Sequence, residues 1–293
     1  MTGGDKEDGV ADGLEIAVRE RAELGEGPTW DPVAERLVWV DILSSRVHLF
    51  DPATGRRTVL PTEQHVGAAK PRRDGGLVVN LRDGVGLYDP DGTFRWLRRE
   101  VVRGRRGNDA AVAPDGALWA GTMRYDERTG GGTLSRVAPD GAALTVLPEV
   151  TVSNGLGWSP DGRALYFIDT PTRRIDVFTV AEDGGVTGRR VLVDTAGLSG
   201  FPDGMTVDAD GCLWAAFWDG GALRRFTPEG VLDRTVELPV SRATACAFGG
   251  GGLTDLYVST ARVGVDPRAE PLAGSLLVLP GLGHGLPQPP FAG

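Results

Sequence analysis

The chain has 293 residues, of which 41% are hydrophobic, and it carries a formal net charge of −9. This composition is typical of a folded globular protein, and the negative charge argues against a nucleic-acid partner, which requires concentrated positive charge. No apolar run approaches the ~20 residues needed to cross a bilayer, so no membrane partner is expected.

The first segment, residues 1–13, is acidic and rich in glycine. It has neither the basic start nor the apolar stretch of a signal peptide, which predicts a disordered tail and a cytoplasmic protein. A strand-like segment follows at 14–20. The single folded domain is expected to run from residue 14 to residue 293.

From residue 29 onward the chain repeats one unit, a turn with Asp or Gly followed by an apolar strand. The unit occurs at 29–42, 71–81, 112–123, 158–170, 207–218 and 248–260. A second strand ending in a turn follows each unit, at 45–55, 85–92, 132–141, 173–185, 221–230 and 274–283. Such pairs are typical of β-hairpins, and a repeat of ~40–50 residues is typical of propellers.

These patterns predict an all-β fold, a six-bladed β-propeller with four-stranded antiparallel blades. The last blade ends near residue 280 without an obvious outermost strand. We therefore expect the strand at 14–20 to complete that blade and close the ring. The two cysteines, Cys212 and Cys246, each lie within an apparent strand and are expected to be buried free thiols rather than a disulfide.

Polar residues precede the apolar strand at the same phase of several repeats. Glu26, Asn154 and Asp203 are each followed by Gly, and Asn108 with Asp109 occupies the same phase of the third repeat. Asn-Gly and Asp-Gly are also ordinary turn formers. Because the phase agrees across four repeats, we expect these oxygen-bearing side chains to converge on a hard divalent cation.

The histidines and the glycine runs give weaker signals. The three histidines lack metal-binding spacing; His48 alternates within a strand and is expected to be exposed, whereas His65 is a candidate for the mouth of the propeller. The sequence has no G-x-S-x-G elbow and no P-loop lysine, so triad and P-loop chemistry are not expected.

Five sequence blocks resemble the SMP-30/gluconolactonase (regucalcin-like) family. They are LGEGPTWDP at 24–32, RGNDAAVAPDGALWAGTM at 106–123, VSNGLGWSPDGRALYFIDT at 152–170, FPDGMTVDADGCLWAAFW at 201–218 and CAFGGGGLTDLYVSTAR at 246–262. The resemblance implies a six-bladed propeller with one divalent metal in its central cavity. Calcium is the expected ion, with zinc, manganese or magnesium as alternatives.

The resemblance also implies roles for individual residues. Glu26, Asn154 and Asp203 are the implied metal ligands, and Asp203 is also the implied catalytic base. Arg106 and Asn108 are the implied substrate contacts, with Asp126 as a further acidic contact. Two departures from the family pattern are Ala110, where a glycine is usual, and Ala245, where a hydroxyl residue is usual.

The hypothesis that follows is metal-assisted hydrolysis of a small sugar-type lactone, with the cation polarising the carbonyl and activating a water molecule. One alternative is the same site acting on another ester or a phosphotriester. A second is a propeller that binds calcium without catalysis. The sequence does not distinguish oligomeric states.

Overall fold

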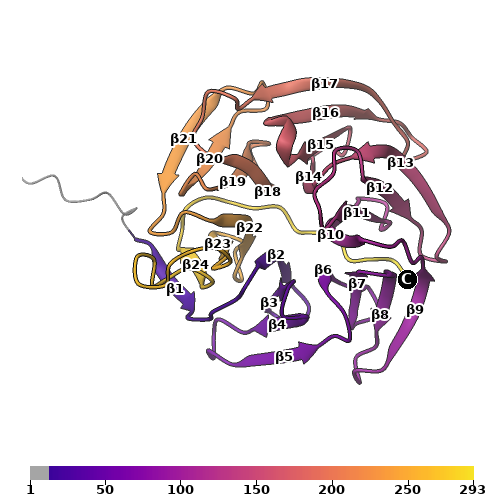
Figure 1. Ribbon diagram of the computed structural model, residues 1–293, viewed down its shortest axis with the longest axis horizontal. Coiled ribbons are helices and arrows are strands. Elements are labelled where there is room, and N and C mark those ends of the chain that lie inside the picture. The colour runs from indigo at the N-terminus through magenta and orange to yellow at the C-terminus, as the bar shows by residue number, and fades with distance from the viewer. Residues whose placement is uncertain (1–12) are drawn as a thin grey trace, which may run out of the picture.

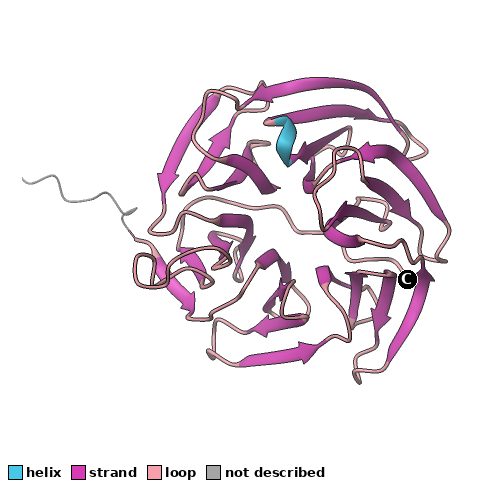
Figure 2. Cartoon of the chain, in the orientation of Figure 1, coloured by secondary structure: helices cyan, strands magenta, loops and turns pink. Residues whose placement is uncertain are grey.

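The computed structural model describes residues 13–293, which form a ring of six four-stranded antiparallel sheets (Figure 1). The predicted all-β, six-bladed propeller is therefore confirmed. The one helical element is a short 3-10 turn, η1 (Thr170–Thr172), which Figure 2 shows in cyan. Of the predicted tail at residues 1–13, all but Gly13 lies outside the described residues.

Blades 1 to 5 each take four strands in chain order from the innermost strand outward, and blade 6 takes its outermost strand from the start of the chain. Blade 1 comprises β2 (Gly25–Asp31), β3 (Arg36–Asp41), β4 (Arg46–Phe50) and β5 (Arg57–Pro61). Blade 2 comprises β6 (Val66–Pro71), β7 (Leu77–Leu81), β8 (Gly84–Tyr88) and β9 (Phe94–Arg99). Blade 3 comprises β10 (Arg105–Val112), β11 (Leu118–Arg124), β12 (Gly132–Val137) and β13 (Ala143–Val150).

The second half of the ring repeats this order. Blade 4 comprises β14 (Ser153–Trp158), β15 (Ala164–Asp169), β16 (Arg174–Val180) and β17 (Val186–Asp194). Blade 5 comprises β18 (Phe201–Val207), β19 (Leu213–Trp218), β20 (Ala222–Phe226) and β21 (Leu232–Glu237). Blade 6 comprises β22 (Ala243–Gly249), β23 (Asp255–Thr260), β24 (Leu276–Leu279) and, outermost, β1 (Glu15–Val18).

Strand β1 closes the ring, as the sequence predicts. It pairs antiparallel with β24, placing Glu15 opposite Val278 and Ile16 opposite Leu277. The first and last strands of the chain thus share one sheet, and the pairing covers the edge of β24 that would otherwise expose unpaired backbone groups.

The six innermost strands surround the axis, and their hydrogen-bonding register shifts at an equivalent point in each blade. In four of them the shift falls at 26–29, 107–110, 153–156 and 202–205. Such bulges interrupt the alternation of a strand and redirect side chains. The predicted polar residues Glu26, Asn108, Asn154 and Asp203 all lie at these shifts, so the fold directs equivalent positions toward the axis.

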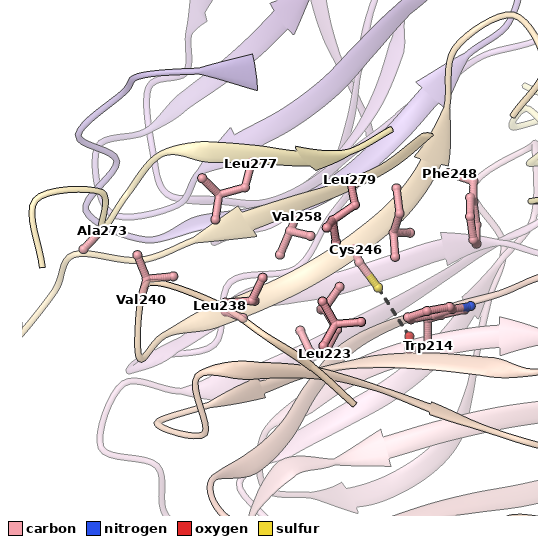
Figure 3. Packing of buried hydrophobic residues seen from close by; sticks show 14 residues of the cluster. Trp214, Leu223, Leu238, Val240, Cys246, Phe248, Val258, Ala273, Leu277 and Leu279 are labelled. Atoms are coloured by element: carbon pink, nitrogen blue, oxygen red, sulfur yellow. Dashed lines mark hydrogen bonds between the residues drawn. The ribbon is translucent and has the colours of Figure 1, made fainter. Parts of the chain in front are cut away.

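Apolar clusters fill the spaces between neighbouring blades. Between blades 5 and 6, Figure 3 shows Trp214 and Leu223 packed against Cys246, Val258 and Leu277. The Cys246 thiol donates to the Trp214 carbonyl at 3.4 Å, and burial raises the pKa of this thiol to about 12. Both cysteines are buried and free, as predicted.

His48 corrects one prediction. It is buried, with 5% of its surface exposed, and its ring stacks on Trp39 at a centroid distance of 4.1 Å. Side chains alternate between the two faces of β4, but neither face is open to solvent at His48, because both faces of a blade can pack against neighbouring blades. Burial also lowers the pKa of His48.

The C-terminal segment returns across the ring. In Figure 1 the yellow chain leaves blade 6 and passes over the centre to end beside blade 2. Its contacts agree: the Ala209 N–H donates to the His284 carbonyl, and the Phe291 N–H donates to the Pro71 carbonyl. Phe291 is fully buried, so the segment is anchored on blades 2 and 5.

None of the helical structure within residues 13–293 is long and apolar enough to cross a membrane.

Candidate metal and substrate site

A cavity of about 370 Å³ lies on the propeller axis. Its lining draws polar side chains from blades 1, 3, 4 and 5, namely Glu26, Arg106, Asn108, Asn154 and Asp203. All five are buried, with 6% or less of their surface exposed. The structure therefore brings together five of the six residues that the sequence predicts for the site.

The three predicted metal ligands present oxygen atoms to this cavity from three blades. Glu26 Oε2 accepts a hydrogen bond from the Gly27 N–H at 2.9 Å, which fixes the carboxylate at the start of β2. The Asp203 Oδ1 atom is buried and has no hydrogen-bond partner. A buried carboxylate oxygen without a partner is costly, so a missing positively charged or donor group is expected there.

The electrostatics of the two carboxylates support the same interpretation. Burial, and then the charge of Asp109, raises the pKa of Glu26 to about 8. Burial, then the charges of Glu26 and Asp109, raises the pKa of Asp203 well above its ordinary value, while Arg106 opposes the shift. Like charges held close together in a buried site favour a cation between them.

The donor set fits a hard divalent cation. Two carboxylates and one amide supply only oxygen ligands, which suit Ca²⁺, Mg²⁺ or Mn²⁺ better than soft metals. Among residues 13–293, no cluster of three or more His, Cys, Asp and Glu side chains forms a candidate metal site. Glu26 and Asp203 are two such residues, and the third predicted ligand is an amide, that of Asn154.

A chain of hydrogen bonds orients the amides. Arg106 Nη1 donates to Asn108 Oδ1 at 2.5 Å, and Asn108 Nδ2 donates to Asn154 Oδ1 at 2.8 Å. Asn154 Nδ2 donates to Thr170 Oγ1 at 2.7 Å, and that hydroxyl donates to the Pro202 carbonyl at 2.9 Å. Each amide therefore has one orientation only, with the Asn154 oxygen on the Asn108 side.

Thr170 is a residue of the cavity to which the sequence patterns assigned no role. It lines the cavity and is the acceptor that fixes the Asn154 amide. Thr170 is the last residue of the block VSNGLGWSPDGRALYFIDT and the first residue of η1. Its place in that block is the sequence feature that could have indicated a position at the cavity.

The structure does not bring Asp126 to the cavity. Its side chain is 55% exposed and forms a two-pronged ion pair with Arg124, at 2.7 and 2.9 Å. The following residue, Glu127, lines the cavity instead, with a backbone φ of 50°. This left-handed turn after β11 places Glu127, rather than Asp126, at the rim.

A second buried charge pair lies deeper on the axis. Lys70 of β6 donates to Thr29 Oγ1 at 2.7 Å and to the Gly27 carbonyl at 3.3 Å. Its charge lowers the pKa of Asp109, against the larger effect of burial, which raises it. Both residues line a small cavity of about 30 Å³, and the sequence reasoning assigned no role to Lys70.

The remaining predicted features lie at the margins. His65 accepts or donates a 2.8 Å hydrogen bond with the Tyr125 hydroxyl, and the Tyr125 ring lies 6.0 Å from the Arg106 guanidinium carbon. His65 therefore does not line the cavity itself but contacts Tyr125, which lies next to Arg106.

The two departures from the family pattern lie in or near the core of the ring. Ala110 pairs with Ala120, so alanine in place of the usual glycine does not disturb the strand, and Ala245 lines the small cavity that also contains Lys70.

Comparisons with known proteins agree with this architecture. The model of the SMP-30/Gluconolactonase/LRE-like region matches residues 24–262. The chain is 36% identical to a 6-deoxy-6-sulfogluconolactonase of Pseudomonas putida, over 96% of this chain and 99% of that protein. It is 37% identical to a pentonolactonase of Haloferax volcanii, over 81% of each. The crystal structure of a calcium-binding regucalcin from Agrobacterium tumefaciens superimposes with a TM-score of 0.91, at 31% identity, covering 94% of this chain and 96% of that one.

Proposed function

The chain belongs to the SMP-30/gluconolactonase/LRE-like family, and we propose that it is a metal-dependent hydrolase that opens a small sugar-type lactone. The observation that carries this proposal is the buried cluster of Glu26, Asn154 and Asp203 beside Arg106, at the floor of a cavity of about 370 Å³. That volume suits a small-molecule substrate. Relatives named for sulfogluconolactone and pentonolactone hydrolysis support the substrate class.

The proposed metal ligands are Glu26, Asn154 and Asp203, with calcium as the expected ion and zinc, manganese or magnesium as alternatives. When bound, a divalent cation supplies positive charge that keeps both carboxylates ionised and a Lewis acid for the lactone carbonyl. The solved regucalcin is titled a calcium-binding protein, which supports the choice of ion.

Asp203 is the proposed base. Its unpartnered Oδ1 atom is the one assigned to the cation, so Asp203 would accept a proton from the attacking water through its other carboxylate oxygen. The water oxygen bonds to the carbonyl carbon, the ring C–O bond breaks, and the proton passes to the departing ring oxygen to give the open hydroxy acid.

Arg106 and Asn108 are the proposed substrate contacts. Among residues 13–293, only the Nη1 atom of Arg106 donates hydrogen bonds to protein acceptors. These acceptors are the Gly107 carbonyl and Asn108 Oδ1. The other N–H groups of Arg106 are available to the lactone carbonyl or to a neighbouring hydroxyl. Fixed donors of this kind stabilise the negative charge that develops on a carbonyl oxygen under attack.

The test is a panel of sugar lactones, aliphatic lactones and phosphotriesters, assayed after elemental analysis of the purified protein and with each metal restored. We expect metal-dependent opening of sugar lactones, lost in Asp203→Asn with an unchanged circular dichroism spectrum. Full activity of metal-stripped Asp203→Asn would refute the proposal. Phosphotriester turnover alone would favour the alternative ester substrate, and metal binding without any turnover would favour a non-catalytic calcium-binding propeller.

We propose the cytoplasm as the location, because Cys212 and Cys246 are buried free thiols and reduced cysteines are the rule in that compartment.

A further inference from the structure

One wall of the cavity is built from aromatic side chains of blade 5. Phe201 begins β18 and Trp218 ends β19, and the two are register partners in the antiparallel pair. Both side chains are half-buried and line the cavity. Neither is needed to hold a cation or to move a proton, so their exposure to the cavity calls for another role.

Each ring is backed by a guanidinium group. Arg173 Cζ lies 4.4 Å from the centroid of Phe201, and Arg242 Cζ lies 4.6 Å from that of Trp218. Arg242 Nε also donates to Asp219 Oδ1 at 2.7 Å. Contacts of this kind restrict the rings, and Arg242 fixes Trp218 and Asp219 together. We call Phe201, Trp218 and Asp219 the blade-5 wall.

Acidic side chains outnumber basic ones in the lining. Glu26 and Asp203 face the proposed divalent cation, and Glu127 and Asp219 line the same cavity. Asp219 is paired with Arg242. Among the described lining residues Arg106 is the one basic side chain, and it donates to the Gly107 carbonyl and to Asn108 Oδ1 beside the proposed cation site rather than at the blade-5 wall.

We propose that the blade-5 wall binds the uncharged, polyhydroxylated ring of the lactone and disfavours a lactone that carries an anionic group at its far end. This inference rests on the proposed function. The C–H face of the ring packs on Trp218 and Phe201, and the carboxylates of Asp219 and Glu127 accept hydrogen bonds from its distal hydroxyls. An anionic substituent there would face two carboxylates in place of a cation.

The inference separates this chain from the relative named for a sulfonated lactone. Next to the blade-5 wall, Arg173 stacks on Phe201 and donates to the Leu198 carbonyl at 2.8 Å, but it does not line the cavity. Arg106 lines the cavity on the side of the proposed cation. These two are the groups that would hold a sulfonate if the inference were wrong, so the test distinguishes them.

The test compares three lactones with the same six-membered ring: D-glucono-1,5-lactone, its 6-deoxy-6-sulfo counterpart and unsubstituted δ-valerolactone. We expect the metal-loaded wild type to favour the neutral sugar lactone over the sulfonated one by at least about tenfold in kcat/KM. Trp218→Ala should raise KM for the sugar lactone about tenfold with little change in kcat, and should also raise KM for δ-valerolactone, whose ring presents C–H groups to the same wall. Asp219→Asn should raise KM for the sugar lactone more weakly and should leave KM for δ-valerolactone, which has no hydroxyls, nearly unchanged.

A binding measurement complements the kinetics. Calorimetric titration with 1,5-anhydro-D-glucitol, the same polyol ring without the carbonyl, should show weaker binding to Trp218→Ala and Trp218→Leu than to wild type. The matched control is Trp96→Leu, because Trp96 lies on the outermost strand β9 and is also stacked by an arginine, Arg99, at 5.7 Å. This control should leave binding and all three KM values unchanged.

The outcomes keep the two proposals apart. If the wild type opens none of the three lactones with any metal, the proposed function fails. If it opens lactones but neither Trp218→Ala nor Asp219→Asn raises KM for the sugar lactone, the blade-5 wall is refuted and the function stands. A wild-type preference for the sulfonated lactone would also overturn the inference: its loss in Arg173→Ala would assign the anion to Arg173, and its persistence there would assign it to Arg106.

Discussion

Glu26→Gln should make the metal-free protein more stable above neutral pH. Burial and the charge of Asp109 raise the pKa of Glu26 from 4.5 to about 8. Between these values the folded protein holds a proton that the unfolded chain has lost, so stability falls as pH rises through this window. Each pKa unit corresponds to about 1.36 kcal/mol, which places the loss on the order of 4 kcal/mol by pH 8.

The substitution removes the ionisable group but keeps its main contact. The Gly27 N–H donates to Glu26 Oε2 at 2.9 Å, and a glutamine oxygen can accept the same bond. We therefore expect Glu26→Gln to weaken the pH dependence and to exceed the wild type in stability at pH 8, while Asp203 and Asp109, whose pKa values are also raised, retain the remaining dependence. The same change removes a proposed metal ligand, so added Ca²⁺ should stabilise the variant far less than the wild type.

Urea denaturation in EDTA at pH 5.5, 7 and 8.5, repeated with excess Ca²⁺, measures both effects. Glu182→Gln is the matched control, because Glu182 is exposed in the turn between β16 and β17 and should change neither curve. The reasoning is refuted if metal-free Glu26→Gln loses stability with pH as steeply as the wild type. It is equally refuted if Ca²⁺ stabilises the variant and the wild type alike.

Three further predictions concern the supports of the site. Thr170→Val removes the acceptor of Asn154 Nδ2, so Ca²⁺ affinity measured by calorimetry should fall severalfold while the fold persists. Lys70→Met leaves Asp109 buried without its cation and should cost about 3–5 kcal/mol in urea denaturation, most of it recovered by adding Asp109→Asn. Arg106→Lys keeps the charge but loses the planar fork that holds the amide chain, so KM for the sugar lactone should rise about tenfold in a pH-stat assay, and an unchanged KM would contradict the assigned role.

The fold was predictable because its signals are local and repeated. The turn aspartates Asp31, Asp74, Asp115, Asp161 and Asp210 recur at intervals of 41 to 49 residues, and each precedes a strand that the structure contains. Strand β1 was predictable for a different reason: the last repeat lacked a fourth strand, and the only unassigned strand-like segment lay at the start of the domain.

The convergence of Glu26, Asn154 and Asp203 was also predictable, since equivalent phases of a propeller repeat meet at the axis. Individual side chains at other positions were not. Lys70 lies 43 residues from Gly27, and only the packing of blade 2 against blade 1 brings its ammonium group to that carbonyl. The burial of His48 against Trp39 depends on packing that a period-two pattern does not encode.

The loop after β11 shows why the substrate contacts were harder to predict than the proposed ligands. Asp126 and Glu127 are adjacent, and the choice between them depends on the left-handed φ of 50° at Glu127. A strand bulge fixes the direction of Asn154 or Asp203 within a hydrogen-bonded sheet, whereas a loop residue is directed by a single backbone rotation.

The same contrast bears on how this cavity acquires its selectivity. The proposed ligands lie at bulges on innermost strands, where a change would disturb the packing around the axis. Phe201, Trp218 and Glu127 lie at strand ends and in a loop, and they line the same cavity without sharing hydrogen bonds with the ligands. Substitutions there can change which ring is bound while leaving the proposed cation site in place. Trp218→Ala should therefore leave calorimetric Ca²⁺ affinity within about twofold of wild type, and a larger loss would show that the wall and the cation site are coupled.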